Sequence, residues 1–305
     1  MPELPEVETV VRELRPKLKN KKIKAVRVLM PKMVAMGPAT VSNLRKNHES
    51  IASTFASTLK NKTITAISRR AKMIIIDLAG RYALLVHLKM TGQLIFLDKK
   101  HLDKQIKLLN IANTTALRLP AKSTYVIFEF TDGSKLFYND YRQFGYLKLV
   151  TDKELPQVAE LQDYGPEPLD KRFTYKEFEK LLSKRATAPI KSWIMDPNII
   201  AGIGNIYSDE ILFFAKVRPT RAVKSLKPKE KMQLYKGVKV VLTNAIGHHG
   251  SSVFEFVRPN GDWGTYGHLH KVYGRSGEKC KVCGTIITSL KFSGRTGSFC
   301  PKCQK

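Results

Sequence analysis

The sequence has no cysteine before residue 280, no long apolar run and a shortage of acidic side chains. A disulfide framework spread through a secreted chain is therefore not expected. The first residues, MPELPE, lack the apolar run of a signal peptide. No segment approaches the roughly 18 apolar residues that a membrane span needs. These absences predict a cytoplasmic protein that has no membrane partner.

The shortage of acid leaves a large positive charge. The chain has 53 Lys and Arg but only 26 Asp and Glu residues, a net charge of +27. Soluble domains need only a few net charges, so the surplus indicates a polyanionic partner. That partner is nucleic acid or an anionic membrane, and the lack of a basic anchor helix favours nucleic acid. Simple solubility remains the plainer alternative.

The cysteines are confined to the end of the chain, in two Cys-x-x-Cys pairs: Cys280, Cys283, Cys300 and Cys303. Sixteen residues separate the pairs, enough for a hairpin that brings them together. This spacing is typical of a tetrahedral zinc site, and two redox dithiols are the alternative. Residues 271–305 hold eight Lys and Arg against one Glu, which favours a nucleic-acid contact over a purely structural zinc module.

The first half of the chain is predicted to be rich in strands behind one helix. Residues 3–19 place five apolar side chains at helical spacing on one face, with Pro5 in the first turn. Strand-like runs follow at 23–29, 63–68, 73–78, 82–88, 93–97, 125–130 and 146–150. Short runs punctuated by turns predict antiparallel hairpins in a sandwich. Residues 98–123 are polar and irregular, which predicts a loop insertion.

The pattern changes near residue 151. The GPEP segment at 165–168 is interpreted as a linker. Helical patterns then cover roughly 174–184, 189–195, 205–215 and 228–247. The sequence therefore predicts three parts, 1–150, 151–270 and 271–305.

Pro2 is the most unusual candidate for chemistry. Met1 precedes a small residue, and its removal would leave Pro2 with a free secondary amine. An α-amino group has a pKa of about 7.7–8.0, so part of it is neutral and nucleophilic near neutral pH. Such an amine can attack the C1′ of a sugar and form an iminium, with Glu3 and Glu6 beside it to move protons. Taken locally, the plainer interpretation is preferred: Pro2 begins a helix and the glutamates favour its dipole.

Several short segments of the chain form an ordered set of motifs. They are MPELPEVET at 1–9, SRRAK at 68–72, HLKMTG at 87–92, DYRQFG at 140–145, GPEP at 165–168, AGIGNIY at 201–207, VYGR at 272–275 and the four-cysteine finger. Together these segments resemble the formamidopyrimidine-DNA glycosylases. They stand in the family's order and span residues 2 to 303. The ordered set is far more specific than any one motif.

The resemblance implies a bifunctional DNA glycosylase and abasic-site lyase of base excision repair. It would excise 8-oxoguanine and formamidopyrimidines through a Schiff base on Pro2, followed by β,δ-elimination. Glu3 would protonate the opening sugar, Lys72 would assist elimination and grip a phosphate, and Arg295 would serve δ-elimination. Glu6 is kept as a further proton-moving candidate. A surface lysine and a solvated arginine are the plainer interpretations of Lys72 and Arg295.

The resemblance also implies how DNA is held. An extruded base leaves a hole in the duplex, and Met90, Arg142 and Phe144 match the residues that fill it. The phosphate contacts would be Asn205, Lys191, Tyr273 and His87. Residues 248–270 would form a mobile loop over the base. Ordinary core packing is the alternative for Met90 and Phe144, and a structural role is the alternative for His87.

The implied fold is a multidomain α+β protein. A catalytic β-sandwich with a leading helix would occupy 1–150, a helix–two-turn–helix domain 151–270 and a four-cysteine zinc finger 271–305. One structural Zn²⁺ is expected, with double-stranded DNA carrying a damaged base as partner and a cytoplasmic, nucleoid-associated bacterial monomer. The chain departs from the family at KSTY, 122–125, where a Lys-His-x-His stretch is usual, which leaves lesion choice open.

Two rival functions remain. Endonuclease VIII-like enzymes prefer oxidised pyrimidines, but they resemble this chain less, because Leu4 stands where they carry glycine and both Arg142 and Phe144 are present. A non-catalytic zinc-finger DNA-binding protein is the rival from another class, and composition alone does not exclude it.

Overall fold

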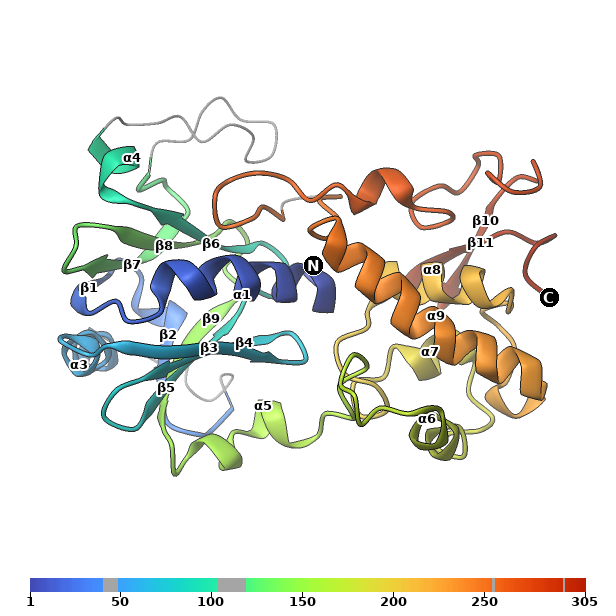
Figure 1. The fold of residues 1–305 in the computed structure, drawn as a ribbon, viewed down its shortest axis with the longest axis horizontal. Coiled ribbons are helices and arrows are strands. Elements are labelled where there is room, and N and C mark those ends of the chain that lie inside the picture. Colours follow the sequence, from blue (N-terminus) through green and yellow to red (C-terminus); the bar gives the residue numbers. More distant parts are fainter. Residues whose placement is uncertain (41–48, 104–118, 254–255, 293) are drawn as a thin grey trace. The chain divides into compact units, whose positions relative to one another are not determined.

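The structure is a computed structural model that describes residues 1–40, 49–103, 119–253, 256–292 and 294–305. The chain forms two units (Figure 1). The first unit comprises Met1–Pro2, Glu6–Gln162 and Ser251–Gly264, and the second comprises Glu3–Pro5, Asp163–Gly250 and Thr265–Lys305. Within the described ranges, no helix is both long and apolar enough to cross a bilayer.

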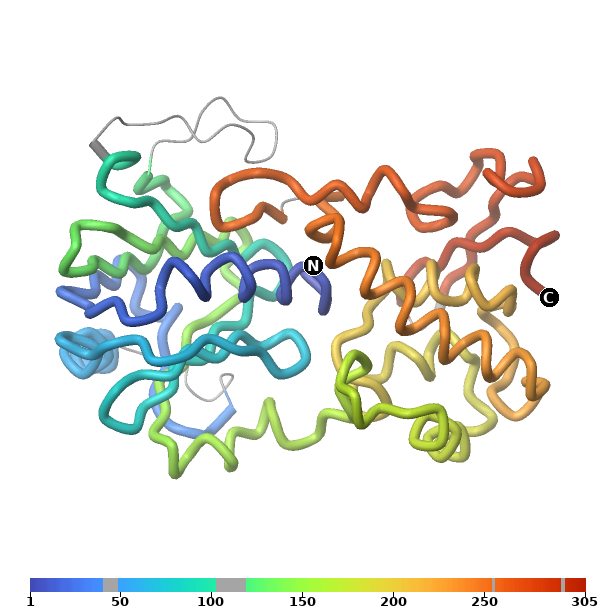
Figure 2. Tube along the Cα trace, in the orientation of Figure 1, coloured from blue at the N-terminus to red at the C-terminus, as the bar shows by residue number. Residues whose placement is uncertain are grey.

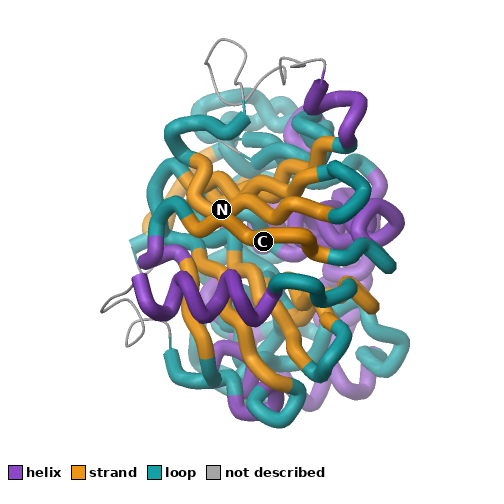
Figure 3. Tube along the Cα trace, turned by 90° about the vertical axis from the view of Figure 1, so that its left-hand side faces the viewer, coloured by secondary structure: helices purple, strands orange, loops and turns teal. Residues whose placement is uncertain are grey.

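The first unit contains two sheets, whose strands Figure 3 draws in orange. One sheet has the order β1-β7-β8-β6, with β1 Ile23–Val28, β7 Thr124–Phe130, β8 Lys135–Asp140 and β6 Gly92–Leu97. The other has the order β2-β9-β5-β4-β3, with β2 Val34–Met36, β9 Tyr146–Thr151, β5 Tyr82–His87, β4 Met73–Leu78 and β3 Ile64–Arg70. The predicted sandwich is confirmed.

Two details of the sheets differ from the prediction. Strand β2 was not predicted, and it pairs with β9 in parallel, whereas the turn pattern predicted antiparallel hairpins. Strand β8 was not predicted, because it ends in Asn139 and Asp140, residue types that are rare in strands. Both side chains are nevertheless buried, so polar contacts rather than propensity fix this end of the strand.

Helices pack against the sheets to complete the core of the first unit. The predicted helix is α1 Leu4–Leu18, and its five predicted apolar residues are all at most 1% exposed. Helix α3 Glu49–Leu59 was not predicted; it buries Phe55 and Leu59 and contacts β1 of one sheet and β2 of the other. Short elements complete this unit: η1 Pro31–Met33, α4 Lys99–Asp103, η2 Leu155–Gln157 and α5 Ala159–Gln162.

The prediction of a loop over 98–123 holds only in part. Helix α4 starts the segment, because the Asp98 carboxylate accepts the backbone N–H of His101 at 2.8 Å and caps the first turn. Strand β7 begins at Thr124, and residues 104–118 lie outside the described residues.

The chain returns to the first unit after α9 (Figure 2). Phe256 and Val257 are buried in its hydrophobic clusters, and the Phe96 backbone N–H donates to Pro259 O at 2.8 Å. Arg258 pairs with Glu13 of α1 at 2.6 Å. These residues belong to the predicted mobile loop at 248–270, and residues 254–255 of that loop lie outside the described residues. The described part at 256–259 is packed against the unit.

The second unit is built on the four predicted helices. They are α6 Tyr175–Leu181, α7 Ile190–Ile194, α8 Asn205–Ala215 and α9 Pro228–Gly247, with the short turns η3 Val223–Ser225 and η4 Tyr266–Leu269. Trp193, Phe178, Tyr207 and Leu234 are fully buried in their shared core. The predicted linker at 165–168 is instead packed on this unit, since Gly165 N donates to Pro197 O at 2.8 Å.

The cysteine-rich end forms a hairpin of β10 Thr288–Phe292 and β11 Arg295–Phe299. Its last residues are tied to the segment after α8. Gln304 donates to Val217 O at 3.0 Å and accepts from Cys300 N at 2.9 Å. The finger therefore sits at a fixed place on the helical unit.

Candidate active site

The carboxylate of Glu3 lies at the N-terminus of α8. It accepts the backbone N–H groups of Gly204 at 2.8 Å, Ile206 at 2.9 Å and Tyr207 at 3.3 Å, and the residue is only 3% exposed. The first N–H groups of a helix have no partner within it, so a carboxylate satisfies them and complements the helix dipole. A Cβ on Gly204 would lie 2.5 Å from Glu3 Cδ, which explains the glycine. Pro2, directly before Glu3, is buried.

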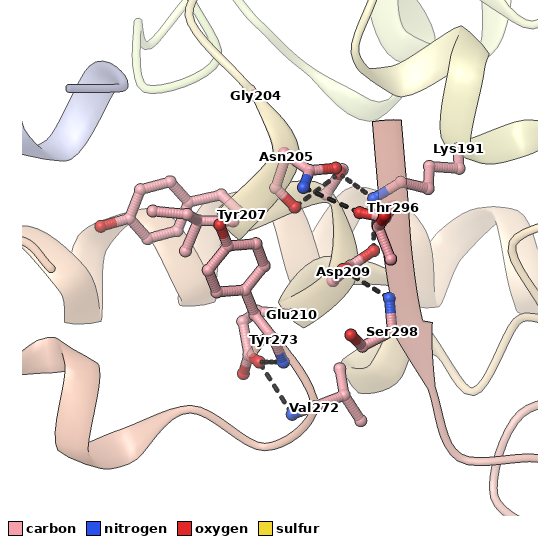
Figure 4. A network of polar contacts seen from close by, with 12 residues as sticks. Lys191, Gly204, Asn205, Tyr207, Asp209, Glu210, Val272, Tyr273, Thr296 and Ser298 are labelled. Carbon is pink, nitrogen blue, oxygen red and sulfur yellow. Dashed lines mark hydrogen bonds and ion pairs between the residues drawn. The ribbon is translucent and has the colours of Figure 1, made fainter. Parts of the chain in front are cut away.

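An acidic residue of helix α8 itself, Asp209, lies one turn further along the helix (Figure 4). Asp209 forms an ion pair with Lys191 of α7, both side chains are fully buried, and Asp209 also accepts Ser298 N at 2.8 Å. Burial lowers the pKa of Lys191 and raises the pKa of Asp209 to about 6. Lys191 was predicted to bind a phosphate; in the structure its buried ammonium contacts Asp209 and the Ser208 hydroxyl, and the phosphate contact stays a prediction.

The neighbouring Glu210 holds the segment that precedes the finger. Its carboxylate, 3% exposed, accepts the backbone N–H groups of Lys271, Val272 and Tyr273, each at 2.9 Å. Burial raises the pKa of Glu210 above its usual value. These bonds fix the backbone of Tyr273 beside α8, as Figure 4 shows.

Three predicted site residues come together around this helix end. Asn205 Nδ2 donates to Thr296 O at 2.9 Å, which places it against strand β11, whose first residue is the exposed Arg295. The Tyr273 side chain hydrogen-bonds Asn205, and burial followed by the charge of Glu3 raises the pKa of Tyr273. Glu3, Asn205 and Tyr273 thus form one cluster.

The first unit holds a separate group of predicted residues around His87. This residue is 7% exposed, and burial, followed by the charges of Lys89 and Lys72, lowers its pKa to about 3. Its Nδ1 accepts the Lys89 N–H at 3.0 Å, so we assign the proton of the neutral ring to Nε2. Lys72 is half-buried in the turn from β3 to β4. The ammonium groups of Lys72 and Lys89 and the Nε2–H of neutral His87 are groups that suit a phosphate oxygen.

The three predicted void-filling residues project from two turns. Met90 is 38% exposed and Phe144 is 44% exposed, so ordinary core packing is wrong for both. The Arg142 guanidinium lies 4.7 Å from the centre of the Phe144 ring, within the range of a cation–π contact.

Glu6 occupies a different position from Glu3. It is 1% exposed and accepts the backbone N–H of Ser251 at 2.7 Å, where the chain rejoins the first unit. In this arrangement one of its oxygens is committed to the backbone.

The sulfur atoms of the four cysteines lie within 4.8 Å of one another, and none is in a disulfide. Cys280 Sγ and Cys303 Sγ are 4.0 Å apart, and Cys283 Sγ and Cys300 Sγ are 3.5 Å apart. A tetrahedral zinc with Zn–S bonds of about 2.3 Å needs sulfurs about 3.8 Å apart. The backbone N–H groups of Val282 and Cys303 point at sulfurs at 3.4 Å, which favours thiolates. The residues present therefore fit a zinc ion.

Comparison with known proteins assigns the family. Models of the formamidopyrimidine-DNA glycosylase N-terminal domain, its H2TH domain and a zinc finger found in FPG and IleRS match residues 1–147, 164–256 and 277–305. The formamidopyrimidine-DNA glycosylase of Pelotomaculum thermopropionicum is 37% identical over 305 residues, which cover 100% of this chain and 99% of that protein. The chain belongs to the formamidopyrimidine-DNA glycosylase family. The resemblance inferred from its motifs is confirmed, and with it a DNA glycosylase of DNA repair.

Relatives and solved structures agree along the whole length. The formamidopyrimidine-DNA glycosylase of Listeria monocytogenes is 35% identical, with 100% of both chains covered. A Lactococcus lactis Fpg in complex with abasic-site DNA has a TM-score of 0.80 at 30% identity and covers 99% of each chain. The same enzyme with Fapy-dG DNA has a TM-score of 0.80 at 31% identity, covering 99% of this chain and 100% of that chain.

Sequence reasoning missed three buried acidic residues that hold candidate site residues in place. Asp209 and Glu210 bind backbone of the finger and of the segment before it, and Asp140 binds the two turns that carry Met90, Arg142 and Phe144. A signal was present in α8, where two adjacent acids interrupt an apolar helix in a chain short of acid. Burying a charge is costly unless it is paired, so such a pair indicates a structural contact.

The lowered pKa of His87 predicts an acid-dependent loss of stability. In the unfolded chain, His87 takes up a proton as the pH falls below its usual pKa of 6.5. In the folded protein its pKa is about 3, so it takes up the proton only near that pH. The stability due to neutral His87 is therefore complete above pH 6.5 and is lost as the pH falls towards 3. Relative to His87→Gln, which cannot titrate, the wild-type free energy of unfolding should fall by about 1.4 kcal/mol between pH 7.5 and 5.5. Urea unfolding at both pH values measures this difference, and parallel curves would contradict the burial of a neutral ring.

Proposed function

We propose that this chain is a bifunctional glycosylase and abasic-site lyase that excises oxidised purines from double-stranded DNA through the amine of Pro2. The observation that carries the proposal is the contact of Glu3 with the start of α8. It fixes the residue next to Pro2, and the Cα atoms of adjacent residues are only about 3.8 Å apart. The amine is thereby presented at a defined place once Met1 is removed.

The proposed reaction begins at C1′ of the damaged nucleotide. The Pro2 nitrogen attacks C1′, and the oxidised base leaves with the electron pair of the glycosidic bond. The attacking nitrogen then carries a proton, which Glu3, the adjacent residue in the chain, would take up and deliver to O4′ as the sugar ring opens. The nitrogen lone pair forms the C=N bond of the iminium. Loss of a proton from C2′ then expels the 3′ phosphate, and a second elimination expels the 5′ phosphate.

The remaining residues would hold and distort the DNA. Lys72 and neutral His87 form a phosphate site on the first unit, while Asn205, Tyr273 and Arg295 form another on the second. Met90, Arg142 and Phe144 would enter the space left by the extruded base, since they are already exposed. We assign Lys191 to positioning because it is paired with Asp209, and Glu6 to positioning because it holds Ser251 N and, unlike Glu3, is not adjacent to Pro2 in the chain.

The four cysteines would hold one structural zinc. Four thiolate ligands leave no open position for water, so the metal would maintain the hairpin that carries Arg295 rather than take part in the reaction. The finger also reaches α8 through Ser298 N and Asp209. Loss of the metal would therefore loosen the phosphate site.

The role of Pro2 predicts that removal of Met1 switches the chemistry on. Protein that retains Met1 should give no borohydride-trapped adduct with an abasic duplex, and treatment of the same sample with methionine aminopeptidase should produce it. Lys72→Gln should still be trapped, because its amine is not the nucleophile in this proposal. Equal trapping before and after Met1 removal would contradict the proposal.

A second prediction concerns the lesion. Single-turnover excision of 8-oxoguanine or formamidopyrimidine opposite cytosine should be at least about tenfold faster than excision of thymine glycol, a difference of about 1.4 kcal/mol in the barrier. The pyrimidine lesion is a demanding control, because a Lactococcus lactis Fpg has also been solved with DNA that contains an oxidised pyrimidine. The reverse order would favour the endonuclease VIII-like alternative, and no excision of either lesion would favour a non-catalytic DNA-binding protein.

A third prediction concerns the metal. Elemental analysis should give one zinc per chain, and titration of the thiols with an organomercurial should release it as Cys280, Cys283, Cys300 and Cys303 react. The zinc-free protein should bind duplex DNA more weakly. Full DNA affinity after complete release of zinc would contradict a finger that supports Arg295.

A further inference from the structure

The turns that carry Met90 and Arg142 share one buried polar connection. Thr91, the residue after Met90, is 7% exposed, and Asp140, at the end of β8, is 0% exposed. The Thr91 hydroxyl donates to Asp140 Oδ1 and also accepts the backbone N–H of Arg142 at 2.9 Å. One hydroxyl therefore contacts both turns.

The other oxygen of Asp140 holds the far end of the second turn. Asp140 Oδ2 accepts Gly145 N at 2.7 Å and the Tyr138 hydroxyl at 3.3 Å. A Cβ on Gly145 would lie 2.1 Å from the Tyr138 oxygen and 2.7 Å from His87 O, so only glycine fits there. Arg142 and Phe144 are thus held between two bonds to the same carboxylate network.

The Met90 turn is equally confined. Gly92 N donates to Leu88 O at 2.8 Å, and a Cβ on Gly92 would lie 2.5 Å from that oxygen. Both turns are therefore tight and anchored in the ends of strands, while Met90 and Phe144 remain exposed. A group held in its bound geometry loses less conformational entropy when it binds.

We propose that Asp140 and Thr91 are positioning residues that couple the Met90 turn to the Arg142–Phe144 turn. The void-filling side chains of both turns then enter the duplex together. This inference rests on the proposed function, because it concerns how a base is extruded. Neither residue touches the reacting atoms. Their contribution belongs to the step that replaces a stacked base, not to the attack by Pro2.

The test separates that step from the attack. Thr91→Val keeps the shape and removes the hydroxyl, whereas Thr91→Ser keeps the hydroxyl. With 8-oxoguanine in a duplex, Thr91→Val should slow single-turnover excision by about tenfold or more, because a misplaced positioning group costs up to about a hundredfold. Borohydride trapping on a single-stranded abasic oligonucleotide, which has no stacked base to replace, should stay within about twofold of wild type. Thr91→Ser should recover most of the duplex activity.

Two controls make the outcome specific. Thr131→Val removes the hydroxyl of an exposed threonine in the β7–β8 turn of the same unit, and it should leave both readouts unchanged. In a Met90→Ala background, Thr91→Val should slow duplex excision less than it does in the wild type, because both changes affect the same coupled pair of turns. Fluorescence of 2-aminopurine beside the lesion should report slower extrusion in Thr91→Val.

The outcomes distinguish this inference from the proposed function. A wild-type protein that does not excise the lesion contradicts the function itself. If the wild type is active and Met90→Ala is slow while Thr91→Val is normal, the inference alone is wrong. Equal losses on the duplex and on the single strand, with a lower Tm, also contradict it, because they show general damage to the fold.

Discussion

The contact of Glu3 with the N-terminus of α8 is the interaction on which the proposed chemistry depends. Three N–H groups at one helix end hold a single carboxylate, and hydrogen bonds to a charged group contribute about 1.5–3 kcal/mol each. The same helix places Asn205 against β11, and its Asp209 and Glu210 bind Ser298 and the backbone at 271–273. One helix thus orders the residue next to Pro2, the finger and Tyr273.

Acidic residues in this protein are scarce, and several of them serve as acceptors for backbone N–H groups. Glu3, Glu6, Asp140 and Glu210 are each at most 3% exposed, and each accepts at least one main-chain N–H. This use is consistent with a strongly basic surface, because a buried carboxylate that is satisfied by the backbone does not repel a polyanion at the surface.

Local patterns predicted α1, most strands and the four helices α6 to α9 of the second unit, because apolar spacing reports burial on one face. They did not predict what depends on distant partners. Strand β2 has only three residues and pairs in parallel with β9, and β8 ends in Asn139 and Asp140. The packing of residues 256–259 against the first unit could not be predicted from the local sequence either, because it depends on distant partners. Motif resemblance gave Lys191 as a phosphate contact, but it did not predict the buried ion pair that Lys191 forms with Asp209. A motif identifies a charged residue such as Lys191, but only the folded structure shows which group its side chain contacts.

The most direct measurement of the central claim is peptide mass spectrometry of the borohydride-reduced complex between the protein and abasic DNA. After digestion of DNA and protein, the account predicts a deoxyribose-derived mass on the nitrogen of Pro2, in a peptide that begins at residue 2. The remnant on Lys72 or another lysine, or on a peptide that still carries Met1, would contradict it.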